Sequence, residues 1–455
     1  MSGAGIVPAP GRFRDGRGVP MMWKLEPRRR VLIGPVVLAA ILLSSVPASA
    51  AWPAPTSWWL NLRSTGYVYQ TEEIADAPLD RFAAYQEFDG AVSGLANGKL
   101  AFRMGGRVAD DLSLKRKVTD RSRLYVGHAE ARIDPRLTAR FGRQFVQEGP
   151  TGLTLDGLWL STRPAAGWDA QIWGGARAPY DRRFAPGELG NDAAWGARVG
   201  TRPLPFARLA ASWAYRERDG RVASRPAGLD GSIALPYGVR AVGRAVYDFE
   251  RDMWEREDAL VQWQLRPDLP VVTGQFIDRR PAIDAASYFA RFGTVERVRQ
   301  ARGSVRYEHR TGFGLEAEVV GTFLDWRETS RIAGAVLLPV ARVGYSVRTG
   351  DNTGEQNRFF GDGSVRVLPW LRLEAGGAVE TYSFLDDPAE SDEFDLTSAY
   401  ARVRAFPRGG IGVTLEVQRL DNPLYEEDFR VLGGIDFSMG RGASRFGLGR
   451  GGWLR

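Results

Sequence analysis

The strongest constraint on this chain is an alternation of apolar and polar residues that recurs between residues 57 and 440. From 239 to 249 every second residue is small or apolar, and the residues between them include Arg240, Arg244 and Asp248. A period of two is typical of a β-strand whose two faces meet unlike surroundings. These runs last roughly 10 to 13 residues, which suits a tilted membrane-spanning strand, whereas strands of soluble proteins average about 5 to 6. We therefore expect an all-β transmembrane fold.

Short connections containing Pro or Gly separate the alternating segments. They lie at residues 97–98, 134–135, 163–164, 203–205, 235–236, 267–270, 311–312, 338–339, 368–369 and 406–410. Longer polar connections lie between them, at 177–192, 216–229, 281–298, 384–394 and 421–428. Tight turns on one rim and longer loops on the other are typical of a single antiparallel up-and-down transmembrane β-barrel. Counting two strands for each turn, with the first and last strands added, gives about 22, within a range of roughly 18 to 22 because some segments alternate weakly.

Residues 28–50 have the pattern of a secretory signal peptide. Basic residues 28–30 precede an apolar stretch at 31–46, and Ala48 and Ala50 follow with the spacing of a cleavage site. About 16 apolar residues interrupted by a proline are too few for a spanning helix, which needs about 20. We expect export and cleavage near Ala50, by the general route or, because the basic run contains adjacent arginines, by a twin-arginine route.

These features divide the chain into four segments. Residues 1–20 are expected to be a non-native N-terminal extension, because two further methionines stand just before the basic run. Residues 21–50 are the signal peptide, 51–440 the transmembrane β-barrel, and 441–455 a C-terminal tail rich in Gly and Arg. Only about seven residues separate the cleavage site from the first strand, so we expect no N-terminal plug domain.

Composition removes most metal and cofactor chemistry. The 455 residues include no Cys and 2 His, which argues against disulfide scaffolds, zinc ribbons, iron–sulfur clusters and c-type haem attachment. Of 61 basic and 54 acidic residues, seven and two fall within residues 1–50, so the remaining chain carries 54 and 52 and is nearly neutral. We expect no cofactor, no metal site and no nucleic-acid partner.

Neither histidine stands in a catalytic pattern. His128 lies in mid-strand beside Glu130, His309 lies next to a tight turn, and no G-x-S-x-G element accompanies them. We expect no enzymatic activity, and keep a structural or enzymatic outer-membrane barrel as an alternative.

Tryptophans are expected to form the aromatic girdles of a membrane barrel, because they lie near predicted strand ends or on the apolar phase. They are Trp58, Trp159, Trp168, Trp195, Trp213, Trp263 and Trp370. The alternative is that they form the core of a soluble β-sandwich.

In these respects residues 57–440 resemble Gram-negative outer-membrane porin-like barrels. The segments Phe141-Gly142-Arg143-Gln144 and Leu155-Asp156-Gly157 are similar to the GRQ and LDG stretches of alginate-export-type barrels. The resemblance implies a place in the outer membrane of a Gram-negative bacterium, in contact with its lipid and lipopolysaccharide. Such barrels often end on an aromatic residue that the barrel-assembly machinery recognises; Phe437 is the candidate here, and Trp453 is the second choice.

If the apolar phase faces lipid, the other phase lines the lumen. Its arginines are expected to favour anions, because guanidinium groups bind carboxylate and phosphate with paired hydrogen bonds. The candidates are Arg103, Arg107, Arg140, Arg240, Arg244, Arg302, Arg306, Arg342, Arg366, Arg402 and Arg404. The plainer interpretation is a set of cross-strand ladders, for example with Arg302 and Arg306 facing Glu316 and Glu318.

The sequence therefore predicts a porin-like channel for the passive passage of small or anionic solutes. The alternative is the barrel component of a polysaccharide-export or porin–cytochrome complex, which brings a periplasmic or lumenal protein partner. A barrel of about 22 strands needs something to narrow it. Loops 177–192 and 281–298 are long enough, and the second is the candidate constriction. Its residues of interest are Arg279, Arg280, Tyr288, Arg291 and Arg297.

Overall fold

The computed structural model describes the barrel region of the chain and leaves its ends aside. The described residues are 57–72, 78–111, 122–179, 181–182, 184–280, 296–350, 355–383, 393–422 and 425–441. The chain divides into two units, Met1–Trp52 and Pro53–Arg455, and all described residues belong to the second. The predicted extension, signal peptide and most of the C-terminal tail therefore lie outside the described residues. Within these ranges, no helix is long and apolar enough to cross a membrane.

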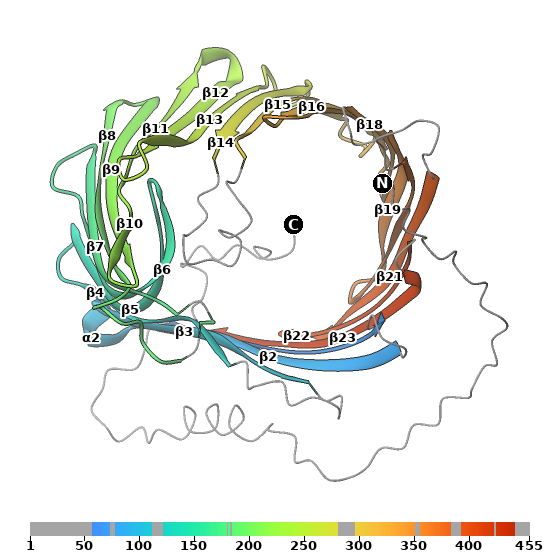
Figure 1. Cartoon of the computed structure of the whole chain (residues 1–455). Coiled ribbons are helices and arrows are strands. Elements are labelled where there is room, and N and C mark those ends of the chain that lie inside the picture. Colours follow the sequence, from blue (N-terminus) through green and yellow to red (C-terminus); the bar gives the residue numbers. More distant parts are fainter. Residues whose placement is uncertain are drawn as a thin grey trace, which may run out of the picture. The chain divides into compact units, whose positions relative to one another are not determined.

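Antiparallel strands make up almost all of the described chain (Figure 1). They are β1 (Ser57–Glu72), β2 (Pro78–Gly94), β3 (Leu100–Asp111), β4 (Arg123–Arg132), β5 (Leu137–Glu148), β6 (Thr151–Thr162), β7 (Trp168–Arg177), β8 (Ala193–Leu204), β9 (Ala207–Arg218), β10 (Arg221–Ser224), β11 (Pro226–Leu235), β12 (Val239–Asp248), β13 (Met253–Trp263), β14 (Val271–Arg279), β15 (Val298–Glu308), β16 (Gly314–Phe323), β17 (Glu328–Leu337), β18 (Ala341–Gly350), β19 (Gln356–Leu368), β20 (Leu371–Ser383), β21 (Glu393–Arg408), β22 (Ile411–Asn422) and β23 (Tyr425–Arg441). Two turns are helical, α2 (Leu95–Gly98) and the 3-10 turn η1 (Pro236–Gly238).

The strands close into one ring. Apart from β10, each strand pairs with the next along the chain, and β23 pairs with β1, from Trp58 opposite Arg441 to Tyr69 opposite Arg430 (Figure 1). Both β10 and β11 pair with β9 and are separated only by Arg225, so they form one interrupted strand. The described chain is therefore a closed 22-stranded antiparallel barrel, which confirms the predicted fold and strand count. Closure pairs the first strand with the last, which would otherwise be the two edges of the sheet.

All ten predicted tight turns are present and join strands at the same rim, which we call the turn rim. Asp134 shows how a turn forms locally: its carboxylate accepts hydrogen bonds from the backbone N–H of Arg136 (2.6 Å) and Leu137 (2.9 Å). The first residue of β1 and the last residue of β23 lie at this rim as well. We call the opposite end of the barrel the loop rim.

Two of the predicted long loops are wrong. Residues 216–229 contain the ends of β9 and β11 and all of β10, and Asp219 and Gly220 alone connect β9 to β10. Both have positive φ angles, 52° and 70°, which fits the primed turns that match strand twist. Residues 421–428 likewise belong mostly to β22 and β23. Polar residues at these strand ends have the composition of a loop, which explains the error.

Candidate functional site: the barrel lumen

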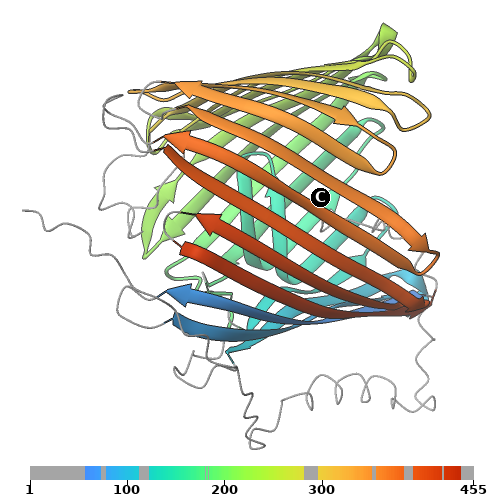
Figure 2. The same ribbon diagram turned by 90° about the vertical axis from the view of Figure 1, so that its right-hand side faces the viewer.

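The inward face of the wall is identified by a hairpin that lies inside the ring. Strands β5 and β6 meet at a tip that Figures 1 and 2 show within the barrel. At this tip the carbonyl of Pro150 accepts a hydrogen bond from Arg216 of β9 (2.9 Å), and a Cβ built at Gly149 would collide with Ser212. Residues of β9 in phase with Ser212 therefore face inward, and Trp213 faces outward.

Strand register carries this assignment around the barrel. Cross-strand partners share a face, so the sequence of registers from β9 in both directions fixes the orientation of every neighbouring residue. The eleven arginines predicted for the lumen are all in the inward phase. The outward phase carries exposed apolar residues such as Phe276, Val319 and Phe437.

Most of the predicted tryptophans are exposed, as Trp168, Trp195 and Trp213 illustrate. Trp195 packs edge-on against Trp213, with 6.0 Å between ring centroids, near the loop rim. Trp159 is different: it is on the inward phase and buried with Trp173. Its assignment to an outer girdle is wrong, because an interior apolar core requires the same residue type as a lipid-facing surface.

Many of the inward arginines bind carboxylates. Arg103 contacts Asp89 (3.1 Å), Arg140 contacts Glu130 (2.7 Å), Arg342 contacts Glu316 (3.2 Å), Arg402 contacts Glu374 (2.9 Å) and Glu416 (2.5 Å), and Arg404 contacts Glu374 (3.6 Å). Arg107 lies over the ring of Tyr85, 4.9 Å from its centroid. Arg240, Arg244 and Arg366 lie on the same face by register.

The predicted ladder between β15 and β16 is partly formed. Arg302 binds Glu318, as expected, and Glu318 also binds Arg331 of β17. Arg306 instead binds Glu308 of its own strand (2.8 Å), and Glu316 binds Arg342. Cross-strand charge ladders are therefore a real feature of this wall.

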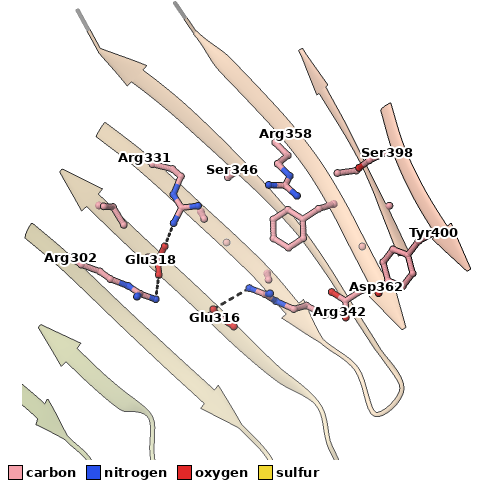
Figure 3. A pocket seen from close by; sticks show the side chains of 18 of the residues that line it. Arg302, Glu316, Glu318, Arg331, Arg342, Ser346, Arg358, Asp362, Ser398 and Tyr400 are labelled. Atoms are coloured by element: carbon pink, nitrogen blue, oxygen red, sulfur yellow. Dashed lines mark hydrogen bonds and ion pairs between the residues drawn. The ribbon is translucent and has the colours of Figure 1, made fainter. Parts of the chain in front are cut away.

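The inner wall is hollowed between β15 and β21. Figure 3 shows this hollow, which has a volume of about 760 Å³. Small inward residues such as Ala333, Ala335 and Ala378 contribute to its lining, and their short side chains leave the space open. Its lining also includes Arg302, Arg331, Arg342, Arg358, Phe360 and Tyr400.

The two charges of these ion pairs are unequally exposed. The side chain of Glu318 is 10% exposed, whereas those of its partners Arg302 and Arg331 are 46% and 47% exposed. Arg358 and Glu380 repeat the arrangement, at 48% and 15%. Glutamate is the shorter side chain, so its carboxylate lies close to the wall while the longer arginines extend above it. The guanidinium groups are therefore more exposed than the carboxylates that they bind.

The predicted constriction loop is only partly described. Arg279 ends β14, and Arg280 follows it and donates its backbone N–H to the carbonyl of Glu255 (2.9 Å). Arg297 binds Asp278 through Nε (2.8 Å) and Nη2 (2.5 Å), and these hydrogen bonds raise the pKa of Arg297 above its usual value. Tyr288 and Arg291 lie outside the described residues. The inward course of this loop stays a prediction.

The inward β5–β6 hairpin was not predicted from the sequence. Strand β5 pairs with β4 only as far as Arg143, and β6 pairs with β7 only from Leu155 onward. Beyond these points residues 144–148 pair with 151–155, and residues 151–154 have no partner in β7. The tip thus leaves the wall and enters the lumen, where the turquoise hairpin is visible through the barrel in Figure 2.

An apolar core holds this hairpin against the inner wall. Val146, Leu153 and Leu155 from the hairpin form one buried cluster with Trp159, Trp173, Ala194 and Ala214 of the wall. Burial of each valine or leucine side chain stabilises the arrangement by about 1.5–3 kcal/mol. Phe145 lies in the other phase of β5 and is exposed to the lumen.

A single arginine ties the base of the hairpin to the neighbouring chain. Arg143 binds both oxygens of Asp156 (2.6 and 2.7 Å). It also donates to the carbonyls of Leu124 (3.2 Å), Arg182 (3.4 Å) and Ala185 (2.7 Å). The side chain is 3% exposed. Hydrogen bonds to these acceptors hold the buried guanidinium group in one position.

The loop at 178–192 covers the place where the hairpin leaves the wall. The backbone N–H of Leu124 in β4 donates to the carbonyl of Arg182 (2.7 Å), and that of Ala178 donates to Thr154 (2.9 Å). The N–H of Gly187 donates to Asp156 (2.8 Å). The described residues of this loop thus join β4 to the base of the hairpin. This role differs from the narrowing of the lumen for which the loop was considered.

The two histidines lie far apart in the sequence, one in a strand and one in a turn. No group of three or more His, Asp or Glu side chains in the described part of the chain could hold a metal ion. His309 contacts the hydroxyl of Thr311 (2.8 Å) within a tight turn, and His128 lies in β4 opposite Gly142.

The solved structures of a translocation pore and of a siderophore receptor share this fold. The translocation pore of the P pilus usher PapC aligns with 84% of this chain and 99% of its own, at 8% identity and a TM-score of 0.50. The siderophore receptor PirA of Pseudomonas aeruginosa aligns with 84% of this chain and 80% of its own, at 12% identity and a TM-score of 0.51. No family model matches the sequence, and no curated protein is significantly similar to it. The chain is a closed, porin-like β-barrel.

Proposed function

We propose that the chain is a porin-like channel of the Gram-negative outer membrane, through which small anionic solutes pass passively. Its support is the division of the wall into an apolar outer face and a charged inner face, which is the pattern of barrels in that membrane. Both ends of the barrel meet at the rim with tight turns, as expected for the periplasmic side of an exported barrel.

The unequal exposure of the paired charges carries the anion preference. Glu318 serves two arginines, so this part of the wall has one more positive than negative charge. Because the arginines extend farther into the lumen, they approach a passing ion more closely than the recessed carboxylate does, and Coulomb interactions weaken with distance. Guanidinium groups also offer paired donors that match carboxylate and phosphate oxygens.

The hollow between β15 and β21 gives such a solute room beside the wall. Arg342 and Arg358 lie on the ring of Phe360, 5.2 and 5.7 Å from its centroid, which orients both guanidinium groups at the hollow. We expect small carboxylates to pass along this wall by exchanging between neighbouring arginines.

Flux into liposomes tests the proposal. Proteoliposomes of the purified barrel should take up acetate and lactate faster than protein-free liposomes, and faster than ammonium-type cations of similar size. The double variant Arg331→Gln/Arg358→Gln should lose much of this difference, and Arg310→Gln in a turn should keep it. Equal uptake of anions and cations by the wild type would reject the anion preference, and no uptake would reject the channel.

A further inference from the structure

The bend that sends the β5–β6 hairpin inward is built into two paired glycines. Gly142 of β5 stands opposite Gly157 of β6. Gly142 has a φ of 121°, which other residues rarely adopt, and a Cβ there would collide with the carbonyl of Gly127. A Cβ at Gly157 would collide with Gly174. Only residues without a side chain fit where the hairpin turns away from the wall.

The side chains on either side of this bend explain why the hairpin cannot remain in the wall. Arg143 is in phase with outward-facing Phe141, and Asp156 is in phase with Leu158. Continued as regular wall strands, β5 and β6 would point a charged pair at lipid, where charged side chains are energetically costly. The inward bend and the covering loop at 178–192 enclose the pair instead.

We infer that the β5–β6 hairpin is the fixed constriction that sets the size limit of the channel. The apolar core and the Arg143–Asp156 pair hold it inside the lumen, and Phe145 on its free face borders the open passage. Phe145 is 58% exposed, whereas its neighbour Val146 is 2% exposed. The inference rests on the proposed channel function, and it assigns the narrowing to this hairpin in addition to any contribution from loop 281–298.

Shortening the hairpin tests this directly. Replacing residues 145–154 by Asn-Gly should raise single-channel conductance by on the order of twofold, because the obstructing strands are removed from the lumen. Larger neutral sugars should then enter proteoliposomes that exclude them with the wild type. Heat-modifiable gel migration establishes that the variant has folded into a barrel.

Cysteine labelling gives a second measurement that leaves the hairpin intact. The chain has no Cys, so Phe145→Cys and Val146→Cys each introduce a single thiol. A bulky, membrane-impermeant thiol reagent should react with Phe145→Cys and lower its conductance by more than half, and should leave Val146→Cys unmodified. Labelling of Phe145→Cys without any change in conductance would contradict the place of Phe145 beside the passage, and together with an unchanged conductance and size limit of the shortened variant it would overturn the inference.

The outcomes separate the two proposals. If the wild type conducts and neither shortening nor labelling alters conductance or size limit, the hairpin inference is wrong and the channel stands. If only the shortened variant conducts, the hairpin blocks the lumen completely, and passive passage through the native protein is wrong. If no form of the folded barrel conducts, both proposals are wrong.

Discussion

Arg143 and Asp156 form a two-bonded ion pair between β5 and β6, with N–O distances of 2.6 and 2.7 Å, at the level where both strands leave the barrel wall. The pair joins three parts of the chain, because the same guanidinium binds carbonyls of β4 and of the loop at 178–192. The pair therefore holds the hairpin in its inward position and at the same time holds β4 and this loop together.

Removing one member of this pair should strongly destabilise the barrel. Asp156→Asn leaves a buried guanidinium without its counter-charge, for which we expect a loss of about 3–5 kcal/mol. The variant should lose its heat-modifiable form at a lower temperature than the wild type. Glu308→Gln, which breaks the exposed pair with Arg306, should cost about 0–1 kcal/mol. Equal stability of Asp156→Asn and the wild type would contradict the structural role of the pair.

The glycine at the bend should not tolerate a side chain. We expect Gly142→Ala to destabilise the barrel by roughly 1–3 kcal/mol, because φ is positive and Gly127 occupies the position of the new methyl group. Gly274 lies in β14, where a Cβ has no atom within 4 Å. Gly274→Ala is therefore the matched control and should keep the wild-type unfolding temperature. Similar temperatures for both variants would show that the bend at Gly142 is not required.

The carboxylate of Glu318 should limit the anion preference of the wild-type wall, so its removal should increase that preference. Glu318→Gln removes one negative charge beside Arg302 and Arg331. We expect the permeability ratio of chloride to potassium to rise by on the order of twofold, because both guanidinium groups lose a close counter-charge. Reversal potentials across a planar bilayer measure this ratio. A ratio that falls in Glu318→Gln would contradict the assignment of this wall to the permeation path.

Phe437 is proposed to serve in barrel assembly. It lies on the outer face of β23, opposite Leu62 and Ile411. Phe437→Ala should lower the fraction of newly exported protein that reaches the heat-modifiable form, measured by pulse–chase in cells. Phe359→Ala on the outer face of β19 is the control for lost apolar surface. If both variants assemble at the same rate, Phe437 has no special part in recognition.

The barrel itself could be predicted because two independent patterns agree. Alternation over the strands and the ten tight turns both follow from local sequence, and each specifies an antiparallel meander. Loop lengths at 216–229 and 421–428 could not be predicted in this way, since polar strand ends and loops have the same composition.

The inward hairpin could not be predicted from its apolar residues, because they suit two different environments. Val146, Leu153 and Leu155 contact an interior core, yet their composition equally suits lipid contact. The informative signal was charge: Arg143 and Asp156 stand in the phases of Phe141 and Leu158, which face outward. Charged residues opposite one another on a lipid-facing phase indicate strands that leave the membrane.

Ion selectivity of the wild-type channel tests the central claim most directly. Purified protein should be reconstituted into a planar bilayer between two concentrations of KCl, and the reversal potential recorded. The exposed guanidinium groups of the inner wall predict measurable conductance. They also predict a reversal potential with the same sign as the equilibrium potential of chloride. A reversal potential with the sign of the potassium equilibrium potential would contradict the account, and so would a correctly folded barrel that does not conduct.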